Sequence, residues 1–144
     1  MNDFEKRLKK QLLDNDDAFR WCISFIDFCH FLDDVVDQDN PAGLKDEHIA
    51  KVSLTFLIES STNLFYEAHK HSLLPLIVAG FNAWLDSNVW EKEKRFGADV
   101  LKGFYHEVIY QCIFLLGGWN HLRETTLEAR EYDLDLQKEN KEDE

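Results

Sequence analysis

Apolar residues recur every three or four positions along most of the chain, which is the spacing of amphipathic helices, and no stretch alternates as a strand does. The pattern therefore predicts an all-α fold, a single bundle of six to seven helices. The first six helical segments are expected at residues 3–14, 17–38, 45–59, 63–72, 75–93 and 98–116. A seventh segment is expected to reach about residue 132.

Residues that favour turns or helix ends separate these segments. The run 39–43 (DNPAG) has the composition of a turn, and the hydroxyl residues 60–62 end the third helix and can cap the fourth. Pro75 suits the first turn of a fifth helix, because its missing N–H is not needed there. The pair 117–118, two glycines, is expected to end the sixth helix.

The length of 144 residues corresponds to one ordinary domain. A hydrophobic content of 44% supports a packed core, and only 6 Gly and 2 Pro argue against a turn-rich β-sandwich or a glycine-looped nucleotide fold. We assign residues 1–130 to a single all-α domain. Residues 131–144 are acidic and lack helical periodicity, so we expect a frayed or disordered tail.

The chain is strongly acidic, with a formal net charge of −12. This charge disfavours direct binding to nucleic acid, whose phosphates are bound mainly by Lys and Arg, but it permits a cation or a basic protein partner. The N-terminus lacks the apolar segment of a signal peptide, and the most apolar stretch, 73–85, is shorter than a membrane span. We therefore expect a soluble, cytoplasmic protein whose thiols, Cys22, Cys29 and Cys112, are reduced and mostly buried.

The predicted helix 17–38 is apolar around most of its circumference, which is typical of a central helix in a bundle. Its apolar arc consists of Trp21, Cys22, Phe25, Phe28, Cys29, Phe31, Leu32, Val35 and Val36. The other side carries a polar cluster made of Asp27, His30, Asp33, Asp34 and Asp37. Carboxylates gathered on one helix repel each other and are costly to desolvate, so something must relieve that cost.

Divalent cations, a basic partner or exposure to water can each relieve the repulsion. Carboxylates three or four residues apart lie on one helix face, about 5–6 Å apart, and Mg²⁺ prefers oxygen ligands of this kind together with phosphates. We therefore predict a metal site at Asp27, Asp33, Asp34 and Asp37, with Mg²⁺ (or Mn²⁺) as the cofactor. The alternative is that these acids form a solvated face.

The run from His30 to Asp37 (HFLDDVVD) resembles the first aspartate-rich motif, DDxxD, of trans-isoprenyl diphosphate synthases and the related squalene and phytoene synthases. In that family the motif lies on a helix lining a central cavity, and its first and last aspartates bind the Mg²⁺ that holds the substrate diphosphate. By position, the resemblance implies Asp33 and Asp37 as metal ligands, with Asp34 supporting them. It implies Mg²⁺-dependent binding or turnover of a diphosphate-bearing small molecule.

A second run on the same helix, DFCHF at 27–31, resembles part of the metal-binding helix of MazG-like pyrophosphohydrolases and dimeric dUTPases and dCTPases. These are small, all-α, Mg²⁺-dependent proteins that assemble as oligomers. Their motif has a Glu where this chain has Ser24. This resemblance implies, as an alternative, a nucleoside triphosphate pyrophosphohydrolase.

The predicted helix 98–116 carries a second line of polar residues, which includes Asp99, His106 and Tyr110, with Glu107 to one side. If this helix faces the aspartate cluster, His106 and Glu107 are the candidate catalytic residues, as a general base that activates water. Tyr110 is a candidate substrate-binding residue, and so is Arg20, a cation able to contact a phosphate. The alternative is that His106 and Tyr110 are hydrogen-bonded packing residues.

No second aspartate-rich motif follows, so a second metal-binding wall would come from another helix or a second subunit. For this reason we expect a homodimer. A third functional hypothesis belongs to another class: a non-catalytic acidic helical protein that binds or inhibits a basic, nucleic-acid-binding protein.

Overall fold

The computed structural model describes residues 1–37, 44–90, 103 and 105–142, with side chains through residue 132. Five helices make up the described part: α1 (Asp3–Gln11), α2 (Asp16–Asp37), α3 (Asp46–Thr62), α4 (Leu64–Trp90) and α6 (Tyr105–Glu142). No strand occurs within those ranges, which confirms the all-α class. Within those ranges the structure shows slightly fewer helices than the expected six to seven. The predicted turn at 39–43 and Asp99, which belongs to the polar line predicted for helix 98–116, lie outside the described residues.

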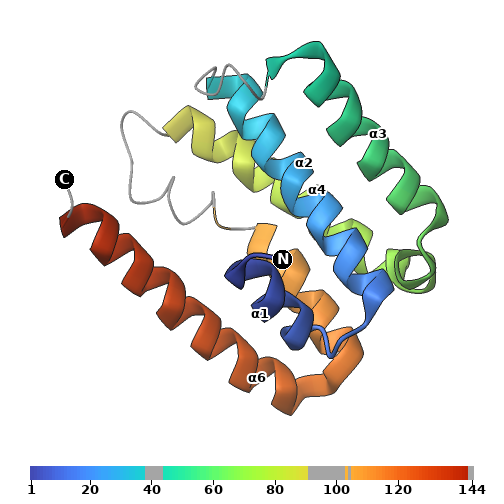
Figure 1. Ribbon diagram of the computed structural model, residues 1–144, viewed down its shortest axis with the longest axis vertical. Coiled ribbons are helices and arrows are strands. Elements are labelled where there is room, and N and C mark those ends of the chain that lie inside the picture. Colours follow the sequence, from blue (N-terminus) through green and yellow to red (C-terminus); the bar gives the residue numbers. More distant parts are fainter. Residues whose placement is uncertain (38–43, 91–102, 104, 143–144) are drawn as a thin grey trace.

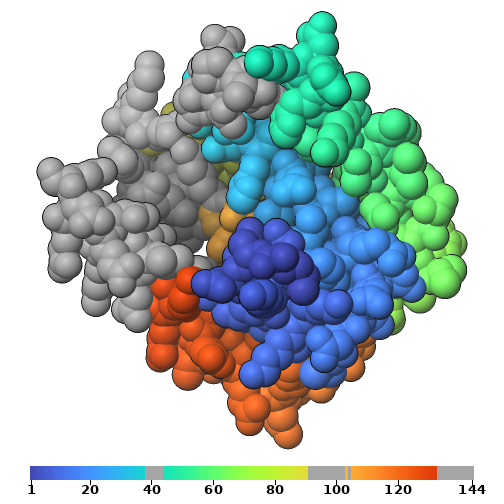
Figure 2. All heavy atoms as spheres, in the orientation of Figure 1, coloured from blue at the N-terminus to red at the C-terminus, as the bar shows by residue number. Residues whose placement is uncertain are grey.

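The helix α2 is the central element of the bundle (Figure 1). It packs against α1, α3, α4 and α6. Its Trp21 is fully buried and stacks on Phe25 and Tyr66, with ring centroids 5.3 and 4.8 Å apart. Seen from the front, α1 lies across the space between α2 and α6 (Figure 2). The wide apolar arc predicted for α2 therefore packs against neighbouring helices on several sides.

A short left-handed turn positions the start of α2. Leu13 and Asp14 have φ angles of 54° and 59°, which reverse the chain after α1. The side chain of Asn15 then accepts a hydrogen bond of 2.9 Å from the backbone N–H of Ala18. This hydrogen bond is typical of an N-cap residue and satisfies one of the free N–H groups at the start of the helix.

A buried asparagine fixes the corner between α3 and α4. Asn63 is 3% exposed, and its side chain accepts a hydrogen bond from the backbone N–H of Tyr66 at 3.0 Å. Its amide donates to the backbone carbonyl of Asp17 at 2.8 Å, which ties the corner to the first turn of α2. The expected boundary between the third and fourth helices is thus present, but it lies at Asn63. Residues 60–62, expected to end the third helix and to cap the fourth, are instead the last residues of α3.

The expected break before Pro75 is wrong. Instead of two helices at 63–72 and 75–93, α4 is one helix of 27 residues with Pro75 inside it. Proline removes one helical hydrogen bond and crowds the preceding turn. Pro75 lies on the exposed side of α4, where water can hydrogen-bond the carbonyl group left without its N–H partner.

The predicted break at the glycine pair in α6 is confirmed as a kink. Gly118 has φ 83° and ψ −176°, a conformation that favours glycine. A Cβ at Gly117 would lie 2.3 Å from the ring of His121, so the close approach also requires glycine there. Beyond the kink the backbone is helical to Glu142, within the segment 131–144 for which the sequence predicts a tail.

Candidate functional site

A cavity of about 280 Å³ lies between α2, α4 and α6. Its wall is mainly apolar. The lining residues are Phe25, Cys29, His30, Leu32 and Asp33 from α2, Ile77, Gly80, Phe81 and Trp84 from α4, and Tyr105 and Val108 from α6. Cavities of this size and lining are the usual binding sites for small molecules, with a few polar groups fixing the orientation of the ligand.

The polar groups of the cavity are divided into two pairs. The indole N–H of Trp84 donates to Oδ1 of Asp33 at 3.4 Å, across the gap between α4 and α2. On the α6 side, Nε2 of His30 lies 3.4 Å from the hydroxyl of Tyr105, whose ring meets the imidazole edge-on. Both distances are long for hydrogen bonds.

Cys29 is part of the apolar wall of the cavity, and its surroundings affect the pKa of its thiol. Burial raises the pKa of Cys29 to about 12, from an ordinary value of 9.0. Desolvation disfavours the charged thiolate, so the shift indicates an apolar surrounding. Cys29 is half-buried, whereas Cys22 and Cys112 are buried, and all three are free thiols. The expectation that the cysteines are mostly buried is confirmed.

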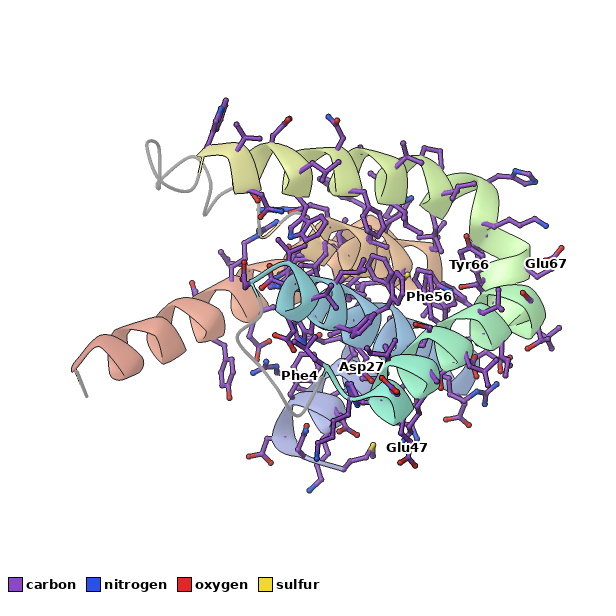
Figure 3. The ribbon with its side chains drawn as sticks, turned by 90° about the horizontal axis from the view of Figure 1, so that it is seen from above. Phe4, Asp27, Glu47, Phe56, Tyr66 and Glu67 are labelled. Atoms are coloured by element: carbon purple, nitrogen blue, oxygen red, sulfur yellow. The ribbon has the colours of Figure 1, made fainter. Side chains whose placement is uncertain are left out.

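A second hollow lies on the other side of the polar face, between α2 and α3. It is lined by Asp27, His30, Phe31, Asp34, His48, Lys51 and Val52. Asp27, labelled in Figure 3, is on the side of α2 that faces α3. Partial burial raises the pKa of the Asp27 carboxyl, and His30, His48 and Lys51 oppose that rise by favouring the charged form. This hollow is a mixed-charge surface.

The four predicted metal ligands are distributed over these two regions. Asp33 lines the apolar cavity, Asp27 and Asp34 line the hollow against α3, and Asp37 is exposed in the last turn of α2. Within the described ranges, no three His, Cys, Asp or Glu side chains gather closely enough to hold a metal ion. The helical spacing that places Asp33 and Asp37 one turn apart is preserved.

The candidate residues on α6 form a cluster of their own beside the cavity. Glu107 accepts a hydrogen bond of 2.9 Å from Arg130, whose guanidinium stands 4.8 Å from the centre of the Tyr110 ring. His106 lies edge-on to both Tyr105 and Tyr110. These three candidates, His106, Glu107 and Tyr110, are absent from the cavity lining, to which α6 contributes Tyr105 and Val108.

The candidate phosphate-binding residue Arg20 lies in the second turn of α2, near the corner with α3. It pairs with Asp17 three residues earlier and approaches Glu59 at 3.7 Å. It is not a lining residue of the cavity or of the hollow. The structure thus brings Asp33 to the cavity and leaves Arg20 elsewhere.

Sequence reasoning missed the residues of α4 and α6 that complete the cavity. Neither Trp84 nor Tyr105 is among the candidate residues that the sequence predicts. The available signal was Gly80 in the middle of an apolar helix, beside Phe81, because an isolated helical glycine often marks close packing or ligand approach.

No family model matches the chain. Neither a curated protein nor a solved structure is significantly similar to it. Among the described residues, no helix is long and apolar enough to cross a membrane.

Proposed function

We propose that this protein binds a small molecule with an apolar body and a diphosphate group, with Mg²⁺ or Mn²⁺ held by Asp33 and Asp37. The observation that carries the proposal is the position of Asp33. This first aspartate of the DDxxD run lies in the wall of an apolar cavity between three helices.

The cavity supports the apolar half of the ligand. Its walls are built from aliphatic and aromatic side chains, with Phe25, Leu32, Ile77 and Phe81 among them. Burying apolar surface in such a site is favourable by roughly 25 cal/mol per Å². A hydrocarbon body satisfies these walls, whereas a nucleobase would bring several polar edges into them without partners.

The donor set supports the charged half. Asp33 and Asp37 are one helical turn apart, so their carboxylates project on one side of α2. Mg²⁺ is typically held by one or two carboxylates together with substrate phosphates and water. One aspartate in the cavity wall and a second one helical turn beyond it fit that arrangement. The bound cation would supply charge neutralisation for the diphosphate, and His30 and Tyr105 would face the same end of the ligand.

Thermal unfolding tests the proposal, because a ligand that binds only the folded state raises the midpoint by mass action. The protein is measured alone, with Mg²⁺ or Mn²⁺, with the metal plus pyrophosphate, and with the metal plus an alkyl diphosphate. We expect the largest rise with the alkyl diphosphate, roughly 5–10 °C at a hundredfold excess over Kd. A matching alkyl alcohol should stabilise the protein less.

The variants Asp33→Asn and Asp37→Asn should each abolish the metal-dependent part of the rise. Asp27→Asn removes the same charge from the same helix, but in the hollow against α3, and should keep it. If the metal and the diphosphate give no rise in the parent, the proposal is wrong. If nucleoside triphosphates stabilise best and Asp27→Asn loses the effect, the pyrophosphohydrolase hypothesis replaces it.

A further inference from the structure

The helix α4 has an apolar outer face that no described helix covers. This outer face consists of Leu64, Leu74, Val78, Leu85 and Val89, which recur at helical spacing and are 52–77% exposed. Figure 3 shows α2 and α6 on one side of α4 only. The opposite, inward side of α4 lines the cavity through Ile77, Phe81 and Trp84. The helix is therefore apolar all round, which in a globular protein is typical of a helix with neighbours on every side.

The same helix is depleted of charge. Between residues 71 and 85 there is no Asp, Glu, Lys or Arg, although these residues make up 31% of the chain. Depletion of charge at the centre of an apolar patch is the compositional mark of a protein interface. An exposed row of this length, on a 27-residue helix about 40 Å long, exceeds the scattered apolar residues normal for a monomer surface.

We infer that the outer face of α4 is the interface of a homodimer, in which α4 packs against α4 of a second copy. This inference goes beyond the proposed ligand site and does not depend on it. A two-fold axis requires one patch that is complementary to itself. From Leu74 to Val89 the row of aliphatic side chains on this face meets that requirement, because it contains no charge that a second copy would have to match; the exposed Glu67 lies beyond it, between Leu64 and Leu74.

The exposed area agrees with a small stable dimer. Each aliphatic side chain on the outer face offers on the order of 60–100 Å², so two copies would bury roughly 600–1,000 Å² of apolar surface. Because homodimer interfaces are about 65% apolar, the whole interface would be roughly 1,000–1,500 Å². Specific interfaces begin near ~1,200 Å².

The charges of the chain favour a second copy over a membrane surface. Helices that lie on membranes carry Lys and Arg along their polar side. In α4 the only Lys or Arg is Lys70, and it pairs with Glu67 at 3.0 Å. A chain of net charge −12 is also repelled by anionic lipids.

Sedimentation velocity over a micromolar concentration series tests the inference. The parent should approach twice the chain mass of 17.0 kDa, and raising the salt concentration should strengthen the dimer, because salt screens the repulsion between two acidic copies. The variants Val78→Arg and Leu85→Arg should remain monomeric at every concentration. Both replace exposed side chains, so the circular dichroism spectrum should stay helical.

The matched control is Leu127→Arg on α6, where the leucine is 56% exposed, close to the 57% of Leu85. This variant should dimerise like the parent. A parent that is monomeric throughout, or a dimer that Leu127→Arg breaks and Leu85→Arg leaves intact, would overturn the inference. The parent could instead be a monomer that floats with zwitterionic vesicles, with Val78→Arg abolishing the vesicle binding. That result would overturn the homodimer inference and would show that the outer face binds a membrane surface. The Asp33→Asn variant should sediment as a dimer, like the parent. The outcome of this test is therefore independent of the test of the ligand site.

Discussion

The two halves of α2 differ in what surrounds them, although the apolar arc of the helix runs through both. Residues 16–26 contribute six buried side chains, Ala18, Trp21, Cys22, Ser24, Phe25 and Ile26. Residues 27–37 contribute one, Phe31. The second half instead lines the apolar cavity on one side and the mixed-charge hollow on the other. One helix thus serves as the core at its start and as the wall of a candidate site at its end.

This difference shows that an apolar arc does not by itself specify a core. Val35 and Val36 continue the arc but are 39% and 51% exposed. Burial depends on a neighbour, and α3 packs along α2 more closely than any other helix does, with Phe56 stacked on Phe28 at 4.5 Å. Where the packing opens, the same apolar residues line the cavity.

Truncating one large side chain in each half gives the strongest test of this division. Trp21→Ala should lower the free energy of unfolding by roughly 3–5 kcal/mol, because the ring is fully buried and stacked. Leu32→Ala should cost less than about 2 kcal/mol, since Leu32 already faces open space in the cavity. Urea denaturation of both variants measures the difference. Equal losses would mean that the second half is as much a part of the core as the first.

The alkylation rates of Cys22 and Cys29 compare the two halves of α2 at the level of single residues. Only the thiolate reacts with iodoacetamide, so a Cys29 pKa of about 12 should slow alkylation roughly a thousandfold relative to an ordinary thiol at pH 8. The rate should rise about tenfold per pH unit up to pH 10. Cys22, whose pKa is also raised by burial, lies in the closed half and should react later still. Peptide mapping after timed alkylation identifies each site.

Reversal of this order, with Cys22 modified first, would contradict the division of α2. The same assay bears on the ligand site. An alkyl diphosphate bound with Mg²⁺ in the cavity should protect Cys29, which is a lining residue, and leave the slow reaction of Cys22 unchanged. Asp33→Asn should remove that protection.

The sequence was sufficient for the features that depend on local chemistry. Helical periodicity predicted the all-α class, and the glycine pair predicted the kink in α6. Pro75 misled, because proline's local preference for a helix start was outweighed by the packing of a long apolar helix. Local rules hold where the chain has no competing tertiary contact.

The site was less predictable, because periodicity places residues on faces without saying what each face meets. It correctly grouped Asp27, Asp33 and Asp34 on one polar side, yet α3 and α4 divide that side into two regions. The pairing of Asp33 with Trp84 joins residues 51 positions apart, a separation that no local pattern encodes. Such contacts require knowledge of which helices are neighbours.

The bond between Trp84 and Asp33 gives a smaller expected effect. Trp84→Phe keeps an aromatic ring in the cavity but removes the indole donor. At 3.4 Å the bond is long, so we expect a loss of about 0.5–1 kcal/mol in unfolding free energy. Trp119→Phe, at a tryptophan that is 64% exposed, is the control and should change stability little. A loss well above that of an ordinary hydrogen bond would show that the cavity wall itself depends on this pair.

The smallest effect expected is a gain in stability from Asp27→Asn. Burial raises the folded-state pKa of Asp27 above its ordinary value of 3.8, so the folded protein binds this proton more tightly than the unfolded chain does. The contribution of Asp27 to stability is therefore greatest below pH 3.8 and is lost as the pH rises through the folded-state pKa. At pH 7 the charged carboxylate is disfavoured, and asparagine should be more stable by a few tenths of a kcal/mol, because Asp27 is largely exposed.

Removing any acid from so acidic a chain reduces general repulsion, so the control must remove an equal charge elsewhere. Asp86→Asn, at an exposed position on α4, does this away from the hollow. The stability of the two variants relative to the parent, measured from pH 3 to pH 8, should diverge as the pH rises, with the larger gain in Asp27→Asn. Gains that remain equal at every pH would show that the hollow against α3 imposes no cost on its carboxylate. The two sides of α2 would then differ in their lining residues alone.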